Sequence, residues 1–156
     1  MNGIVYLTGA GPGDYRLLTL RGREVLERAD VVIYDYLADP RLLEFAPPTA
    51  EKIYVGKKAA DHTLSQDKII DLLIAKAKEG KIVVRLKGGD PFLFGRGGEE
   101  LELLEENGIP YEVVPGITSP LSVPAYNGIP VTHRDFCSSL HIITGHKKEG
   151  EEYNID

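Results

Sequence analysis

Short apolar runs typical of strands alternate with amphipathic helical patterns along this 156-residue chain. The clearest helix is expected to begin at Ser65, a favourable N-cap, and to end at Gly80. Apolar residues recur between them at helical spacing, namely Ile69, Ile70, Leu73, Ile74 and Ala77. Strands separated by helices are typical of βαβ units, whose strands pair in parallel. The alternation therefore predicts an α/β domain with an open, mostly parallel sheet and helices on both faces.

The same patterns can be assigned along most of the chain. Strands are expected at residues 4–8, 31–34, 52–55, 81–86 and 111–114, and further helices at 19–29, 39–45, 99–107 and 119–126. Another strand, at residues 140–144, has no helix after it, so it either closes the same sheet or opens a second domain. We therefore expect an amino-terminal α/β domain over residues 1–134. Residues 135–156 are expected to begin a second α/β domain that is largely absent.

Charge and composition exclude several classes of protein. The formal net charge is −6 and the isoelectric point is near 5.3, and no basic run contains interleaved aromatics, which argues against a nucleic-acid partner. No apolar run reaches about 18 residues and no signal peptide is evident, so we expect a cytoplasmic protein without a membrane partner. Cys137 is the single cysteine and the four histidines lack metal-ligand spacing, so neither an intrachain disulfide nor a metal site is expected.

A glycine-rich segment, Arg85–Glu99, directly follows the apolar core of the strand at residues 81–86. Its five glycines permit backbone conformations and close ligand approaches that a Cβ atom would block. Asp90 precedes proline and is therefore biased toward extended backbone, which would hold its carboxylate at the carboxyl end of the strand. Ligands bind at that edge of open α/β sheets. A binding site is favoured over a simple turn with solvated charges, because function concentrates on loops held by a rigid scaffold.

The loop Gly9–Asp14 partly resembles a dinucleotide-binding loop, because it follows a predicted strand and precedes a predicted helix. The nicotinamide-binding fingerprint is GxGxxG, with the amino end of the helix facing the pyrophosphate. Here the spacing is GxGxG, Pro12 removes a backbone donor, and Asp14 would repel phosphate. A NAD-binding oxidoreductase is therefore the less favoured alternative, and a tight loop that lines a cleft is preferred.

Other polar groups follow predicted strands. Asp35 lies between two tyrosines that would partly desolvate its carboxylate and suit it as a base, although a surface aspartate that caps the next turn fits equally well. Lys57 could donate a proton or hold an anion, but surface lysines are common. Thr118 and Ser119 precede a helix, where their hydroxyls could cap it, contact a ligand, or do both.

Several segments closely resemble the uroporphyrinogen-III C-methyltransferases of the tetrapyrrole methylase family, in both order and spacing. They are Gly9–Asp14, Val31–Asp35, Tyr54–Lys57, Val84–Glu99, Val113–Thr118 and Gly128–Arg134. The resemblance covers nearly the whole chain. The run RLKGGDPFxFGRGGEE with a later GIPxTHR is characteristic of this branch, whereas other tetrapyrrole methylases share mainly the GDP core.

The resemblance implies an enzyme that transfers methyl groups from S-adenosyl-L-methionine to carbons 2 and 7 of uroporphyrinogen III, giving precorrin-2 for sirohaem and cobalamin synthesis. It places the proton acceptor at Asp35 and the proton donor at Lys57. The implied contacts to S-adenosyl-L-methionine are Pro12, Gly88, Gly89, Asp90, Leu93, Thr118 and Ser119. Ser119 replaces an alanine of the family, which makes its contact the least secure. Family members also have a second α/β domain that completes the cofactor site and forms a homodimer.

The substrate implied by the resemblance bears eight carboxylates, which would explain local cations on an acidic chain. Those cations are Lys57, Lys58, Lys87, Arg96 and Arg134. Two alternatives stay open at this point. One is a methylase of the same family that acts on a later corrinoid intermediate, and the other is a non-catalytic tetrapyrrole-binding module.

Overall fold

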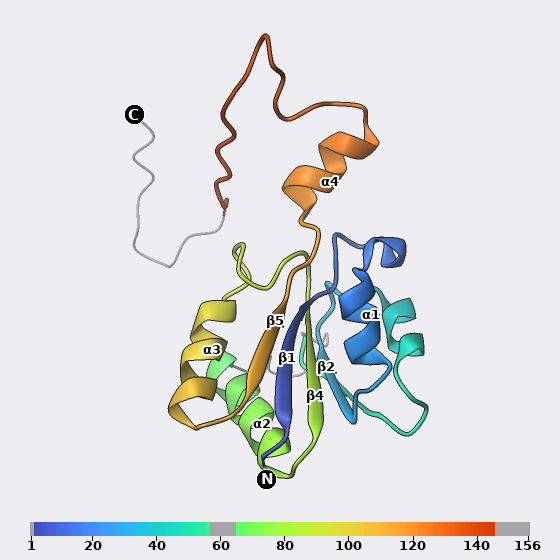
Figure 1. Ribbon diagram of the computed structural model, residues 1–156, viewed down its shortest axis with the longest axis vertical. Helices are drawn as coiled ribbons and strands as arrows, with labels where there is room; N and C mark the ends of the chain where they lie inside the picture. Colours follow the sequence, from blue (N-terminus) through green and yellow to red (C-terminus); the bar gives the residue numbers. More distant parts are fainter. Residues whose placement is uncertain (1, 57–64, 146–156) are drawn as a thin grey trace.

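The computed structural model describes residues 2–56 and 65–145, and these residues contain a single five-stranded sheet (Figure 1). The strands are β1 (Ile4–Gly9), β2 (Val31–Tyr34), β3 (Glu51–Tyr54), β4 (Ile82–Lys87) and β5 (Tyr111–Val114). Their order across the sheet is β3-β2-β4-β1-β5, and every strand pairing is parallel. The predicted α/β class is confirmed, and all carboxyl ends of the strands therefore meet at one edge of the sheet.

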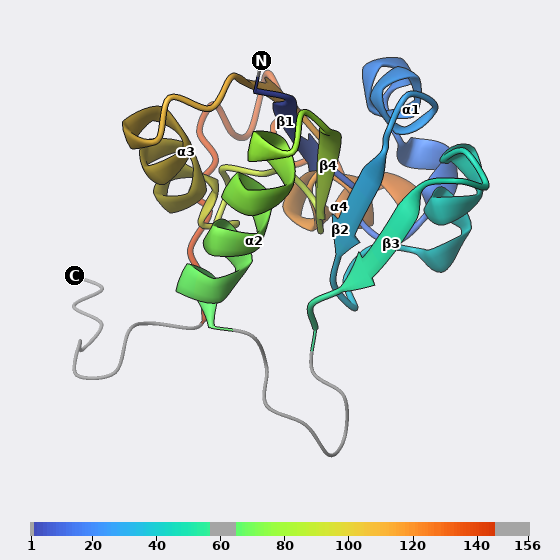
Figure 2. The ribbon, with the colours of Figure 1, turned by 90° about the horizontal axis from the view of Figure 1, so that it is seen from below.

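Helices cover both faces of this sheet, as predicted. The α-helices are α1 (Leu20–Leu26), α2 (Gln66–Lys78), α3 (Gly97–Glu106) and α4 (Ser119–Tyr126), and the 3₁₀ helices are η1 (Tyr15–Leu17) and η2 (Pro40–Phe45). Helix α1 and η2 pack on one face, whereas α2 and α3 pack on the other (Figure 2). Within the described ranges, no helix has the length and apolarity needed to cross a membrane.

Successive side chains of each central strand point alternately into two hydrophobic cores, one on each face of the sheet. On the face of α1 and η2, one core joins strand and helix residues, among them Tyr6, Val32, Val84, Leu86, Val25, Leu26 and Leu42. On the face of α2 and α3, the other core includes Val5, Leu7, Ile33, Val83, Ile69, Leu73 and Leu104. Strands that are buried on both faces read as continuous apolar runs, which is why the sequence pattern locates them well.

Polar side chains mark where the helices begin. Thr19 accepts a hydrogen bond from the amide of Gly22 at the start of α1, and Ser65 accepts one from the amide of Lys68 at the start of α2. The start predicted at Ser65 is therefore confirmed. The helix predicted for residues 39–45 is a 3₁₀ helix, and the one predicted for residues 19–29 ends at Leu26.

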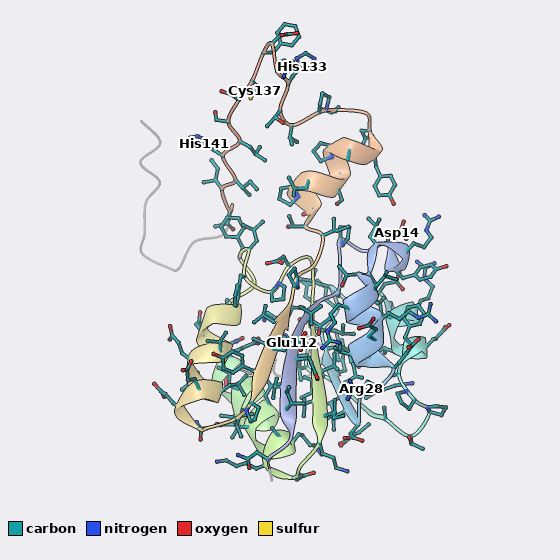
Figure 3. All side chains as sticks on the ribbon, viewed as in Figure 1. Asp14, Arg28, Glu112, His133, Cys137 and His141 are labelled. Atoms are coloured by element: carbon teal, nitrogen blue, oxygen red, sulfur yellow. The ribbon has the colours of Figure 1, made fainter. Side chains whose placement is uncertain are left out.

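The strand predicted for residues 140–144 is wrong. These residues form no strand, and Leu140 and Ile143 are 42% and 66% exposed. A strand needs a neighbour to satisfy its backbone groups, and this segment descends from an outlying tip beside α4, apart from the strands of the sheet (Figure 3). His133, Cys137 and His141 are carried on the same outlying stretch. The segment therefore does not close the sheet, although its apolar, β-branched composition favours strand structure.

Three loops meet main chain to main chain at the carboxyl edge of the sheet. The amide of Gly11 donates to the carbonyl of Gly89 (3.2 Å), and the amide of Gly89 donates to the carbonyl of Gly11 (2.7 Å). A Cβ atom on Gly116 would collide with the Gly89 carbonyl oxygen, and one on Gly9 would lie 2.5 Å from the Cα of Gly116. Only glycine permits such contacts. These glycines therefore fix the spacing of the loops after β1, β4 and β5.

We expect Gly116→Ala to lower the free energy of unfolding by about 1–3 kcal/mol, because the added methyl group must displace the backbone of Gly9 at the end of β1 and of Gly89 in the loop after β4. Gly98→Ala is the control, since its Cβ would meet no atom within 4 Å. In the first turn of α3 this change should be neutral, or should stabilise by up to about 1 kcal/mol. Urea unfolding measures both, and equal effects would contradict the backbone contact.

Candidate functional site

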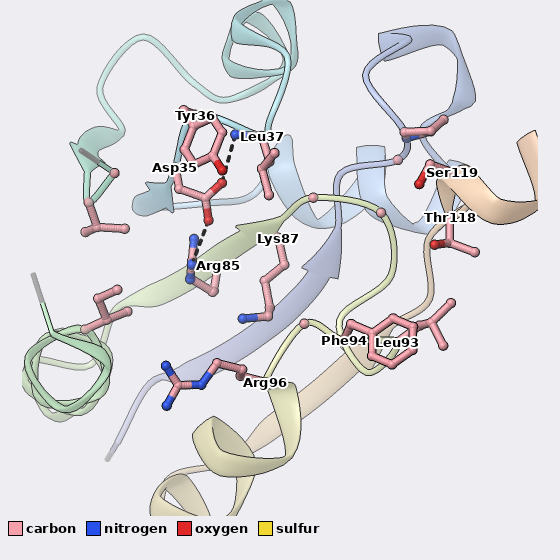
Figure 4. Close-up of a pocket in the computed structure, with 18 of the residues that line it drawn as sticks. Asp35, Tyr36, Leu37, Arg85, Lys87, Leu93, Phe94, Arg96, Thr118 and Ser119 are labelled. Atoms are coloured by element: carbon pink, nitrogen blue, oxygen red, sulfur yellow. Dashed lines mark hydrogen bonds and ion pairs between the residues drawn. The ribbon is translucent and has the colours of Figure 1, made fainter. Parts of the chain in front are cut away.

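A cavity of about 940 Å³ opens at the carboxyl edge of the sheet (Figure 4). Its walls come from the loops after β1, β2, β3, β4 and β5 and from the first residues of α2. This volume lies in the range of small-molecule sites, about 300–1,000 Å³. The cavity therefore occupies the position that the parallel topology predicts for a ligand.

Most of the predicted site residues line this cavity. Those from the proposed cofactor set that line it are Pro12, Gly88, Gly89, Leu93, Thr118 and Ser119. Asp35 also lines it, on the side opposite Thr118 and Ser119 (Figure 4). Lys57 lies outside the described residues, although the preceding residue, Gly56, lines the cavity. Residues spread over more than 100 positions of sequence are thus brought to one cavity.

Asp90 plays a different part from the other predicted contacts, because it is not among the residues that line the cavity. One carboxylate oxygen accepts hydrogen bonds from the amides of Phe92 (2.9 Å) and Leu93 (3.1 Å). The other oxygen accepts one from the amide of Gly116 (3.1 Å). The side chain therefore folds the loop after β4 and ties it to the loop after β5.

The hydroxyl of Thr118 is not used to cap helix α4. Thr118 occupies the N-cap position, but its side chain makes no capping hydrogen bond. A Cβ atom built on Gly89 would lie 3.5 Å from the Thr118 hydroxyl oxygen, which places the hydroxyl beside the glycine turn. Gly89 itself has a φ of +64°, a conformation that favours glycine. The sequence allows the Thr118 hydroxyl to cap the helix or to contact a ligand. Because it makes no capping hydrogen bond, the hydroxyl is available for a ligand.

Asp35 sits in an ionic environment. Its carboxylate accepts hydrogen bonds from the amide of Leu37 (3.0 Å) and from the guanidinium of Arg85 (3.0 Å), as Figure 4 shows. The bond from the Leu37 amide bears out the alternative that Asp35 caps the next turn, and the neighbouring Tyr36 is 71% exposed. The side chain of Asp35 remains 19% exposed and faces the cavity. The carboxylate is therefore held in one orientation by a cation and an amide.

Two buried cations, Arg85 and Lys87, form the floor of the cavity. Arg85 was not identified from the sequence as a residue of the site. Arg85 and Lys87 are 4% and 5% exposed, and both line the cavity. They lie two residues apart on β4 and therefore point to the same face of the sheet. Charged residues are rarely buried unless they are paired. Two cations at this spacing in an otherwise apolar strand were the signal that could have identified them.

The loop after β4 contains backbone strain beside the cavity. Phe94 and Arg96, which both line it, have φ values of +54° and +57°. For residues other than glycine, such conformations cost about 1–3 kcal/mol each and cluster at functional sites. The guanidinium of Arg96 is paired with Glu99 at 2.6 Å. Sequence reasoning assigned the unusual backbone of this loop to its glycines alone.

The first glycine loop does not have the geometry of a dinucleotide site. After Gly9–Gly13 the chain enters η1, and Asp14 caps that 3₁₀ helix through the amide of Arg16. The loop therefore does not present the amino end of an α-helix to a pyrophosphate, and this weighs against the NAD-binding alternative. Of the other predicted cations, Arg134 is exposed and does not line the cavity, and Lys58 lies outside the described residues.

Known proteins resemble this chain along almost its full length. A "Porphyrin biosynthesis protein HemD" from Ruminiclostridium josui is 60% identical over 154 residues, which are 99% of this chain and 31% of that protein. A "Uroporphyrinogen-III C-methyltransferase" from Methanocaldococcus jannaschii is 54% identical over 152 residues, 97% of this chain and 63% of that protein. The chain therefore spans between about a third and two-thirds of the length of these relatives.

A solved structure agrees with the fold. The uroporphyrin-III C-methyltransferase of Thermus thermophilus, in complex with S-adenyl homocysteine, superposes with a TM-score of 0.70 at 53% sequence identity. The match covers 85% of this chain and 54% of that one. The family model of the tetrapyrrole (corrin/porphyrin) methylases matches residues 4–155. With its α/β sheet and its edge cavity, the chain thus belongs to the tetrapyrrole methylase family.

Proposed function

We propose that this chain is the amino-terminal part of a uroporphyrinogen-III C-methyltransferase that uses S-adenosyl-L-methionine. The whole enzyme would methylate carbons 2 and 7 of uroporphyrinogen III and give precorrin-2. The observation that carries the proposal is the edge cavity, which has a glycine and hydroxyl side and an acid and cation side in a chain 54% identical to a methyltransferase of that name. The cavity thus has distinct surroundings for a methyl donor and for a polycarboxylate acceptor.

The glycine and hydroxyl side suits S-adenosyl-L-methionine. Gly88 and Gly89 leave main-chain atoms accessible to a nucleoside, and Thr118 has a hydroxyl that no helix cap uses. Pro12, Leu93 and Ser119 complete this side, while Asp90 holds the loop in shape. When bound, the cofactor supplies a sulfonium methyl group to a nucleophilic carbon. The protein contributes alignment and exclusion of water, which are the main requirements for such a transfer.

Asp35 is proposed to accept the proton that is released when the methylated ring system regains its conjugation. The carboxylate faces the cavity, and its bonds to Arg85 and to the amide of Leu37 hold it oriented. A carboxylate fixed within reach of the substrate has the geometry that a general base requires. Lys57 is proposed as the proton donor, because it directly follows Gly56 at the wall of the cavity.

The chain spans 63% of the length of the Methanocaldococcus jannaschii relative and 54% of the solved Thermus thermophilus chain. We infer that residues 135–156 begin a second α/β domain, which would close the cavity over cofactor and substrate. The complete protein is proposed to be a cytoplasmic homodimer. Measuring the mass of the complete protein in solution by light scattering tests the dimer, and a monomeric mass at all concentrations would contradict it.

In a protein extended to the length of the relatives, Asp35→Asn should reduce methylation of uroporphyrinogen III by about 10²–10⁴-fold, because the amide cannot take up the proton. Affinity for S-adenosylhomocysteine should stay unchanged. Asp71→Asn is the matched control, since Asp71 is exposed on α2 and does not line the cavity. Initial rates and product mass measure the effect. A near-normal rate for Asp35→Asn would remove Asp35 from this role, and a product mass other than that of precorrin-2 would favour a different tetrapyrrole substrate.

Thr118→Val should weaken the binding of S-adenosylhomocysteine about fivefold, which corresponds to the loss of one hydrogen bond of about 1 kcal/mol. Thr49→Val makes the same change at an exposed turn outside the cavity and should leave binding unchanged. Calorimetry on the extended protein measures both. Identical affinities for the two variants would show that the Thr118 hydroxyl makes no contact with the cofactor.

A further inference from the structure

The floor of the cavity is a four-residue charge cluster, of which only Asp35 has a role in the proposed function. Arg85 and Lys87 come from β4, Asp35 follows β2, and Glu100 comes from the first turns of α3. Both strand residues lie on the face where α2 and α3 pack. Two cations and two carboxylates make the cluster formally neutral. Burying them is costly, so each charge needs its partner in place.

Glu100 is the buried centre of this cluster. It is fully buried, and one carboxylate oxygen accepts hydrogen bonds from the Lys87 ammonium (3.0 Å) and from the side-chain amide of Gln66 (3.1 Å). The same oxygen lies 3.6 Å from Nε of Arg85. Glu100 does not line the cavity, whereas both cations do. It is thus placed to act on the cations and not on a ligand.

The three cations on the cavity wall differ in how much of their hydrogen-bonding capacity is used. Arg85 donates to Asp35 and to the carbonyls of Leu86 and Ile33. Arg96 donates twice to Glu99. Lys87 bonds only to Glu100 among the described residues, and an ammonium has three N–H donors. Two of the three N–H donors of this buried ammonium are therefore left for an anionic ligand in the cavity.

The charge of Lys87 depends on Glu100. Burial lowers the pKa of Lys87, the attraction of Glu100 opposes this fall, and the repulsion of Arg85 adds to it. The charged groups that face Lys87 within the described residues are Glu100 from α3, Arg85 from its own strand, and Asp35 after β2. Without Glu100, the two cations would repel each other in a buried site. Removing its charge would therefore lower the pKa of Lys87 further.

We propose that Lys87 binds a carboxylate of the tetrapyrrole substrate and that Glu100 is the positioning residue that keeps the Lys87 ammonium charged and directed toward the cavity. This inference rests on the proposed function. Charge-assisted hydrogen bonds between ammonium and carboxylate are among the stronger polar contacts in proteins. The two remaining N–H donors on Lys87 meet the chemistry of a substrate that carries carboxylate side chains on every ring.

The test uses the extended protein with uroporphyrinogen III, and measures both its dissociation constant and the steady-state rates. Lys87→Met should raise the dissociation constant and KM about tenfold or more, since a charged hydrogen bond is lost, while the affinity for S-adenosylhomocysteine stays unchanged. Lys87→Arg should restore most of the substrate affinity. The control pair is Lys76→Met and Glu51→Gln, which break a surface Lys–Glu ion pair of 2.7 Å outside the cavity and should change neither constant.

The pH dependence of kcat/KM tests Glu100. The charged form of Lys87 binds substrate, so activity falls as pH rises through the pKa of Lys87. Glu100→Gln lowers that pKa, and the alkaline limb should move to lower pH by about one unit or more, whereas Glu100→Asp should keep it near its original position. In the double variant Glu100→Gln, Lys87→Arg, the shift should disappear, because arginine stays protonated.

The outcomes separate the two proposals. If the unsubstituted protein binds uroporphyrinogen III without methylating it, the proposed function fails while the binding constants still decide the role of Lys87. If it methylates normally and Lys87→Met binds substrate as tightly as the unsubstituted protein, the inference is overturned. An alkaline limb that stays in place in Glu100→Gln also overturns it. If circular dichroism shows that Glu100→Gln is unfolded, the Lys87→Met and Lys87→Arg pair decides.

Discussion

The close approach of three glycine-containing loops at one edge of a parallel sheet is the constraint on which the site depends. Because β1, β4 and β5 run in the same direction, their following loops emerge together. Gly9, Gly89 and Gly116 let those loops touch through main-chain atoms, and Asp90 ties two of them with its carboxylate. Side chains at these positions would separate the loops. The cavity wall is therefore made of backbone whose shape is set by the absence of Cβ atoms.

The floor of the cavity, in contrast to its backbone wall, is made of buried charged side chains. Arg85, Lys87 and Glu100 are charged groups in a region where apolar packing would be expected to stabilise the sheet more simply. The Nε of Arg85 and one oxygen of Glu100 are buried without a hydrogen-bond partner. Such incompletely satisfied buried groups carry a cost of about 1–3 kcal/mol each. A charge cluster of this kind makes physical sense where a ligand with charges of its own must be bound and aligned.

Much of the fold could be predicted from the sequence because its signals are local. The strands at 31–34 and 111–114 agree with the predicted bounds, and Ser65 caps its helix as predicted. The segment at 140–144 shows the limit of such signals, because β-branched composition favours a strand but cannot supply a neighbouring one. Likewise, tyrosines that flank Asp35 in sequence predicted an apolar environment, whereas the fold brings Arg85 to the carboxylate.

The sequence by itself determined the α/β class and the edge of the sheet where the cavity opens, and most of the site residues implied by the family resemblance line that cavity. The class and the edge follow from hydrophobic periodicity, from glycine positions and from the rule that parallel strands end together. Only the tertiary structure decided which charges meet. Glu100 lies 13 positions from Lys87, and Asp35 lies 50 positions from Arg85. The first pairing depends on how α3 docks on the sheet and the second on the pairing of β2 with β4, and no local pattern encodes either.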